Sequence, residues 1–166
     1  MCIRDRLMGI SFLAQNAGKK SLTINLKSQK GKEIFLKLVK VSDVVVENFR
    51  PGVMKRLGLE YDCLKKVNSK LIYCSISGFG QTGPMSKRPA YDQIIQGLSG
   101  LMSITGRDGD GPLRVGSPLA DTVGGLTAAM AISAALNKRP RGQEIDVAML
   151  DSLLTTMGWV VSNYLI

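Results

Sequence analysis

The apolar residues of this chain change their spacing repeatedly, and this change constrains the fold more than any other feature of the sequence. Residues 28–41 (SQKGKEIFLKLVKV) place Ile34 and Leu38 on one side of a helix and lysines on the other. Directly afterwards, residues 43–48 (DVVVEN) form a continuous run of β-branched residues, typical of a buried strand in a parallel sheet. A second predicted strand follows at 71–80 (LIYCSISGFG). This alternation predicts an α/β fold with a Rossmann-like parallel sheet and flanking helices.

The remaining segments fit the same alternation. Loops rich in glycine and proline are expected at 77–84 and 105–118, and a short strand at 144–150. Further helices are expected at 53–57, 62–67, 91–104, 121–136 and 151–166. Residues 1–8 match neither pattern, and we expect them to be an unrelated lead-in to a domain that covers residues 9–166.

Histidine is absent from the 166 residues, which removes several mechanisms at once. Activation of a serine or cysteine by histidine is excluded, as are imidazole metal ligands, so catalysis must use carboxylates, hydroxyls, thiols, amines or the backbone. The cysteines Cys2, Cys63 and Cys74 have no CxxC spacing, which indicates reduced, mostly buried thiols. We therefore expect a cytoplasmic protein that needs no metal.

Lysine and arginine outnumber aspartate and glutamate by 22 to 13, which gives a net charge of +9. Nine of these basic residues lie in the first 40 positions, but no zinc ligands or aromatic RNA-binding motif accompany them. Aromatic residues make up 5% of the chain, so stacking on bases has little support. No stretch approaches the roughly 18 apolar residues of a membrane span. The charge therefore favours an anionic, phosphorylated small molecule as ligand, and neither nucleic acid nor a membrane.

Asp121 is the most conspicuous carboxylate because it follows SPLA at the expected start of a helix that continues with a Gly-Gly pair. An aspartate at this place can simply cap the helix. It can also be a nucleophile, because the free amides and the dipole of a helix start keep a carboxylate ionised. Both interpretations stay open. Asp151, after the strand-like EIDVAML, is a second candidate, and its expected role is to cap the last helix.

The segment NFRPGVMKR at 48–56 joins the end of a predicted strand to a turn that contains Pro-Gly. It carries three cations, Arg50, Lys55 and Arg56. Ligands bind beside strand ends in open α/β sheets, and arginine side chains suit phosphate. The segment is therefore either a phosphate-binding turn or a solvated basic turn.

Five motifs follow one another at separations that match a known family. They are FLAQNAGKKSLTINLK (12–27), DVVVENFRPGVMKRLGL (43–59), LIYCSISGFGQTGP (71–84), RPAYD (88–92) and PLADTVGGLTAAMAISAAL (118–136). Together they resemble the class III CoA-transferases, the family of formyl-CoA transferase, the carnitine CoA-transferase and alpha-methylacyl-CoA racemase. The resemblance implies that residues 9–166 are part of the large domain, without its first βα unit and without the small domain, and that coenzyme A is bound as acyl-CoA.

The resemblance also implies a role for individual residues. Asp121 would attack the acyl-CoA thioester as the covalent nucleophile, and the CoA thiolate would return to give an aspartyl-CoA thioester that the acceptor acid takes over. Tyr91 and Asp92 would lie beside the acyl group, although Tyr91 taken alone is typical of a packing aromatic. The implied CoA site comprises Ile24, Asn25, Leu26, Lys27, Asn48, Phe49, Arg50 and Arg56.

Two departures from the family pattern bear on function. The usual NRNK segment is NAGK at 16–19, so a basic side chain near the CoA entrance is missing. Tyr91 stands where the racemases have the histidine that serves as a second base, which favours a transferase over a racemase. The segments WVVSNYLI and RPAYDQIIQGLSGLMSITG are most similar to members that move CoA from succinyl-CoA to dicarboxylic acids, while carnitine-type and formyl/oxalate-type activities stay open.

An alternative from another class is a non-catalytic basic module that binds CoA or nucleic acid. The resemblance implies instead an interlocked homodimer of full-length chains, each threading the other. The expected helices 121–136 and 151–166 have few partners within 166 residues, so we expect this chain alone to expose hydrophobic surface.

Overall fold

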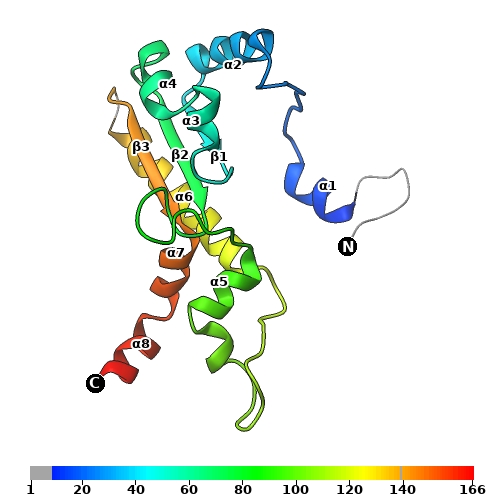
Figure 1. Ribbon diagram of the computed structural model, residues 1–166, viewed down its shortest axis with the longest axis vertical. Helices are drawn as coiled ribbons and strands as arrows, with labels where there is room; N and C mark the ends of the chain where they lie inside the picture. Colours follow the sequence, from blue (N-terminus) through cyan, green and yellow to red (C-terminus); the bar gives the residue numbers. More distant parts are fainter. Residues whose placement is uncertain (1–8, 139) are drawn as a thin grey trace.

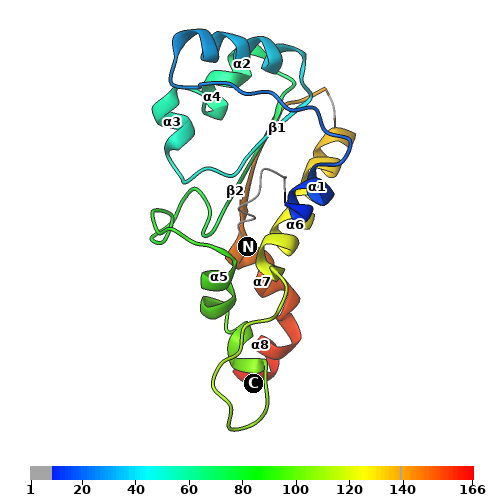
Figure 2. The same ribbon diagram turned by 90° about the vertical axis from the view of Figure 1, so that its right-hand side faces the viewer.

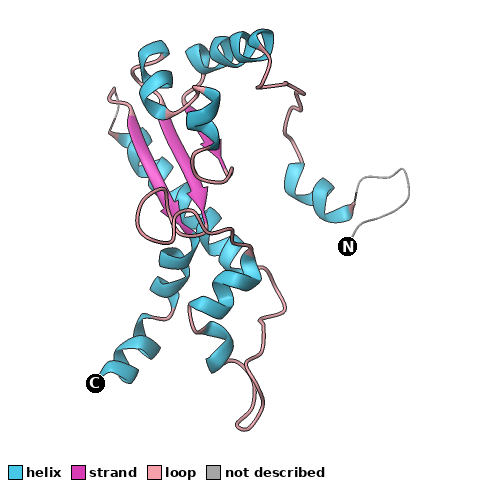
Figure 3. Cartoon of the chain, viewed as in Figure 1, coloured by secondary structure: helices cyan, strands magenta, loops and turns pink. Residues whose placement is uncertain are grey.

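A three-stranded parallel sheet lies at the centre of the structure, a computed structural model that describes residues 9–138 and 140–166. Its strands are β1 (Val44–Glu47), β2 (Ile72–Ser77) and β3 (Gln143–Ala148), in the order β1-β2-β3 (Figures 1 and 3). Val44 pairs with Ile72, and Ile72 pairs with Gln143. The predicted α/β fold is confirmed, and the expected lead-in at 1–8 lies outside the described residues.

Helices precede, connect and follow the strands. They are α1 (Ile10–Asn16), α2 (Gln29–Val41), α3 (Val53–Leu57), α4 (Tyr61–Val67), α5 (Asp92–Leu98), the 3₁₀ helix η1 (Leu101–Ile104), α6 (Leu119–Asn137), α7 (Met149–Thr156) and α8 (Gly158–Leu165). The Ser28 hydroxyl accepts a hydrogen bond from the Gly31 amide at 3.1 Å and so fixes the start of α2.

The sheet is covered on both faces because successive residues of a strand point to opposite sides. On one face, Tyr73 packs with Leu64 of α4 and Met54 of α3. On the other face, Cys74 packs with Ala128 of α6. Figure 2 shows α3 and α6 on opposite sides of the strands. The sheet is thus packed between two apolar layers, one on each face.

A third apolar cluster lies beyond the carboxyl ends of the strands. It is formed by Ile95 of α5, Ala120 of α6, and Met149 and Leu153 of α7. This cluster ties together the three helices that surround the strand ends, and so it sets the floor of the region where a ligand is expected.

Two predicted elements, the strand at 43–48 and the helix at 91–104, differ from those observed. The strand lies at the edge of the sheet, and a glycine interrupts the helix. The run at 43–48 was expected to be buried on both faces, but β1 is an edge strand of the described sheet and Val46 is 53% exposed. The helix expected at 91–104 is divided after α5, because Gly100 adopts a left-handed conformation with φ of 85° and the chain continues as η1.

The last predicted helix, 151–166, begins earlier and is divided. It starts at Met149, directly after β3, and a break at Met157 separates α7 from α8. Asp151 therefore lies inside the first turn and makes no capping bond with its side chain, so its expected capping role is wrong.

α6 is long and apolar enough, by length and composition alone, to cross a membrane, with a mean hydropathy of 1.5. The expectation that no stretch of the chain reaches this limit is therefore wrong. In this fold Ala128 and Ala135 of α6 are buried against the sheet. One side of α6 accordingly serves as a layer of an α/β domain.

Candidate active site

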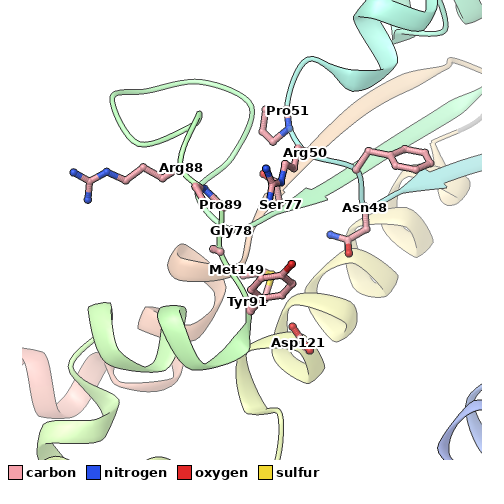
Figure 4. A pocket seen from close by; sticks show the side chains of 12 residues that line it. Asn48, Arg50, Pro51, Ser77, Gly78, Arg88, Pro89, Tyr91, Asp121 and Met149 are labelled. Carbon is pink, nitrogen blue, oxygen red and sulfur yellow. The ribbon is translucent and has the colours of Figure 1, made fainter. Parts of the chain in front are cut away.

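A cavity of about 310 Å³ lies where the three strands end (Figure 4). Asn48, Gly78 and Met149, the residues that directly follow β1, β2 and β3, all line it. Asp121 of α6 lines it as well. The carboxyl edge of a parallel sheet is the usual place for a ligand in an open α/β fold, so this cavity is the candidate active site.

The cavity brings together five of the residues that sequence analysis selected. Asn48, Phe49, Arg50, Tyr91 and Asp121 line it, and they come from the turn after β1, the approach to α5 and the first turn of α6.

The other selected residues lie elsewhere. The segment 24–27 precedes α2, where Leu26 packs against the core, and Arg56 is in the last turn of α3. None of these residues, nor Asp92, is among those that line the cavity.

The turn after β1 is held by local hydrogen bonds. The Asn48 side-chain amide donates to the Ile76 carbonyl at 2.7 Å, which ties the end of β1 to β2. The Phe49 amide donates to the Glu47 carboxylate at 2.7 Å. Burial is the main influence on that carboxylate and raises the pKa of Glu47. Arg50 follows directly and is thereby held at the cavity.

Gly78 explains how the RPAYD segment reaches the cavity. A Cβ atom at Gly78 would lie 2.3 Å from the Cβ of Ala90, which is closer than any real contact. The absence of a side chain at Gly78 lets residues 88–91 cross directly over the end of β2. Tyr91 is thereby brought to the cavity, with 71% of its surface still exposed.

Asp121 does not cap α6, so that sequence interpretation is wrong. The helix begins at Leu119, two residues before Asp121, and has no side-chain cap from its own segment. Its start is capped instead by Asp92 of α5, whose Oδ1 accepts from the Ala120 amide at 2.8 Å and from the Asp121 amide at 3.4 Å. The side chain of Asp121 is thus free of that role and lies exposed at the cavity.

Gln96, one turn further along α5, forms hydrogen bonds to Asp92 and to the loop before α6. Its Nε2 donates to Asp92 Oδ2 at 2.7 Å and to the Ser117 carbonyl at 3.2 Å, while its Oε1 accepts from the Val115 amide at 2.9 Å. Asp92 is 8% exposed and Gln96 is fully buried. We call these two side chains the α5 clamp, because they fasten both the loop before α6 and the first turn that carries Asp121.

The electrostatics at Asp121 also differ from expectation. The pKa of Asp121 is raised, mainly by partial desolvation and to a smaller extent by the negative charge of Asp92. The expected stabilisation of the anion by helix amides is weaker than predicted, because the α5 clamp already takes two of these amides. A carboxylate of raised pKa binds its proton more tightly and is a more basic nucleophile once ionised.

A second cavity, of about 430 Å³, meets the first one at Asp121. Asn48, Asp121 and Met149 line both, and Gln15 of α1 and Thr122 line only the second. Asp121 can therefore be approached from two directions.

Positive charge at the first cavity comes from Arg50 and Arg88. Among the described residues the one ion pair joins Lys65 to Asp62, so no carboxylate neutralises either arginine there. In the same part of the chain, no group of three or more histidine, cysteine, aspartate or glutamate residues is arranged to hold a metal ion. The site can accordingly attract an anion and offer it a carboxylate nucleophile.

Three residues of the site, Ser77, Met149 and Gln96, are not among those predicted from the sequence. The strand-end rule would have selected Ser77 and Met149, since each lies at the end of a predicted strand. No sequence signal identifies Gln96, because two of the three partners of its side chain, Val115 and Ser117, are 19 and 21 positions away, and only Asp92 is on the same helix.

Comparison with known proteins places these features in a family. Residues 4–166 match the family model described as CoA-transferase family III. The chain is 47% identical over 156 residues to an acetyl-CoA:oxalate CoA-transferase of Acetobacter aceti, covering 92% of this chain and 40% of that protein. It is 42% identical over 165 residues to a succinate–glutarate CoA-transferase of Agrobacterium fabrum, covering 98% of this chain and 41% of that one.

A solved structure agrees with the sequence comparisons. The crystal structure of a CAIB/BAIF family protein from Brucella suis superimposes with a TM-score of 0.86 at 42% identity, over 89% of this chain and 40% of that one. The chain thus spans about 40% of the length of these relatives. With the parallel sheet, the strand-end cavity and the exposed carboxylate in place, the chain belongs to CoA-transferase family III.

Proposed function

We propose that this chain carries the nucleophile and part of the CoA site of a class III CoA-transferase, within a longer chain that we call the full-length protein. The observation that carries the proposal is the position of Asp121. It lies exposed in a cavity at the ends of three parallel strands, and two arginines that no described carboxylate neutralises line the same cavity. CoA would enter with its phosphates toward the basic turn of Arg50 and Arg56 and its thioester toward Asp121.

The reaction follows from carboxylate chemistry in balanced steps. An Asp121 oxygen attacks the thioester carbonyl, the C–S bond breaks, and CoA thiolate leaves an acyl-aspartyl anhydride. The thiolate attacks the aspartyl carbonyl and releases the first acid, leaving an aspartyl-CoA thioester. The acceptor carboxylate then attacks this thioester to form a second anhydride and thiolate. Attack of the thiolate on the new acyl carbonyl gives the product acyl-CoA and regenerates Asp121. These steps require no proton transfer.

The substrates that we propose are succinyl-CoA as donor and a dicarboxylic acid as acceptor. Support comes from relatives whose names specify succinate and glutarate, or acetyl-CoA and oxalate. Tyr91 stands where the racemases have a histidine as second base, which argues against the two-base proton exchange of a racemase. The meeting of two cavities at Asp121 also suits a reaction in which CoA and an acid approach the same carboxylate.

We further propose a cytoplasmic, interlocked homodimer. Its support is the apolar surface that α8 leaves open, with Trp159 79% exposed and Tyr164 88% exposed. Light scattering should show a dimer for the full-length protein and aggregation or weak association for the 166-residue chain. A monodisperse monomer of the 166-residue chain that melts cooperatively would contradict this part of the proposal.

Trapping the covalent intermediate tests the assignment of Asp121. Full-length protein incubated with succinyl-CoA and hydroxylamine should form an aspartyl hydroxamate at Asp121, detectable by peptide mass spectrometry. Asp121→Asn should abolish both the hydroxamate and turnover. Asp151→Asn, which changes an exposed carboxylate at the same position of α7, should leave both intact. A hydroxamate at another residue, or normal turnover by Asp121→Asn, would refute the proposal.

A further inference from the structure

The hydroxyl of Ser77 is a buried polar group that the proposed chemistry does not use. Ser77 ends β2 and is 5% exposed, and its Oγ has no hydrogen-bond partner among the described residues. Ser75, two residues earlier on the same face of the strand, bonds through its hydroxyl to the Ile145 carbonyl at 3.4 Å. A buried polar atom without a partner costs about 1–3 kcal/mol, so such atoms commonly mark a place where a ligand binds.

Ser77 lines the same cavity as Asp121. Figure 4 places it at the end formed by Arg50 and Pro51, with Asp121 at the opposite end. The neighbouring polar side chain of Asn48 already donates to the Ile76 carbonyl. Between the cationic turn and the nucleophile, the cavity therefore offers one neutral, uncommitted serine hydroxyl.

The parts of a CoA molecule differ in what they need along this path. Its phosphates need cations, which Arg50 supplies, and its thioester must reach Asp121. The pantetheine arm between them is uncharged but contains two amides, which lose their water when the arm enters the cavity. A neutral hydroxyl can donate to or accept from an amide, whereas a phosphate is matched better by arginine.

We propose that the Ser77 hydroxyl binds an amide of the pantetheine arm of CoA. This inference rests on the proposed function, and it adds a residue to the site that sequence analysis did not select. Ser77 is thereby a CoA-binding residue that helps to hold the thioester at the correct depth for Asp121.

Binding of CoA and of its nucleotide portion alone, measured separately, tests this role of Ser77. Isothermal titration of the full-length protein would use CoA and adenosine 3′,5′-bisphosphate, which retains the nucleotide but lacks the arm. Ser77→Ala should weaken CoA binding about tenfold, or about 1.4 kcal/mol, and leave bisphosphate binding unchanged. The matched control Ser75→Ala should change neither affinity, because that hydroxyl has its own partner and lies outside the cavity.

Thermal unfolding shows whether a loss of affinity comes from damage to the fold. Ser77→Ala removes an unpaired buried hydroxyl, so the melting temperature should stay the same or rise. Unchanged CoA affinity in Ser77→Ala, or an equal loss for both ligands, would overturn the inference while leaving the proposed function intact. A full-length protein that does not bind CoA at all would overturn both.

Discussion

Replacing Asp92 with alanine removes the α5 clamp from the helix that carries Asp121. The Asp92 carboxylate accepts from the Ala120 and Asp121 amides and from Gln96 Nε2, at 2.8, 3.4 and 2.7 Å. Loss of a helix cap costs about 1 kcal/mol, and a buried donor left without a partner costs about 1–3 kcal/mol more. The substitution should therefore lower the free energy of unfolding by about 2–4 kcal/mol.

The effect on turnover should exceed the effect on stability. Without the clamp, the first turn of α6 can shift, and a displacement of about 1 Å at a reacting group costs roughly a hundredfold in rate. Asp92→Ala should accordingly lower kcat by about that factor at temperatures where the protein is still folded. The assay is succinyl-CoA turnover by the full-length protein, with chemical denaturation followed in parallel. Asp151→Asn serves as the control, since that exposed carboxylate makes no capping bond.

Asp92→Asn removes the charge of Asp92 and keeps one oxygen that can accept from the Ala120 amide, while the bond from Gln96 Nε2 is lost. The charge of Asp92 contributes to the raised pKa of Asp121, so its removal should lower that pKa. Because the ionised form of Asp121 is the nucleophile, activity is lost as pH falls through its pKa. The acidic limb of kcat/KM should then move to lower pH in Asp92→Asn. An acidic limb that stays in place, together with stability and turnover equal to those of Asp151→Asn, would refute the role of the clamp.

Three further predictions concern other parts of the molecule. Arg56→Ala should raise the apparent constant for CoA donors about tenfold, through loss of one charge-assisted contact, and an unchanged constant in steady-state kinetics would remove Arg56 from the CoA site. Burial, aided by the charge of Glu47, raises the pKa of the Cys74 thiol to about 11. Cys74 should therefore resist iodoacetamide at pH 8 until the protein is denatured. Rapid labelling of the folded protein, detected by mass spectrometry, would contradict this prediction. Leu153→Ala should lower the free energy of unfolding by about 2–5 kcal/mol, measured with denaturant, because Leu153 is fully buried. Leu126→Ala should lower it far less, because Leu126 is 66% exposed in this chain. Equal losses of stability would show that the third apolar cluster is misassigned.

The fold could be predicted from sequence where local pattern and tertiary environment agree. The run VVV is β-branched and IYCSIS contains two isoleucines and a tyrosine, residue types that favour strands, and both segments are observed as strands. The strand-end rule also led correctly from 48–50 to the cavity. Local pattern failed at Asp121, because the capping group comes from a residue 29 positions earlier. It failed again at 91–104, where the pattern of apolar residues continues past Gly100 but the backbone does not.

The pairing of the strands has a consequence for how the chain acquires its shape during synthesis. β1 and β2 pair across 28 positions, from Val44 to Ile72, whereas Ile72 and Gln143 are 71 positions apart. Closing the longer loop costs more entropy, so β3 joins the sheet late. α6 leaves the ribosome before β3, and until β3 arrives the apolar side of α6 lacks its contacts with Ile145 and Val147. A nascent chain from which α6 has emerged and β3 has not therefore displays a helix that is apolar enough, by length and composition alone, to enter a lipid bilayer, and this interval is when chaperones have the greatest opportunity to bind it.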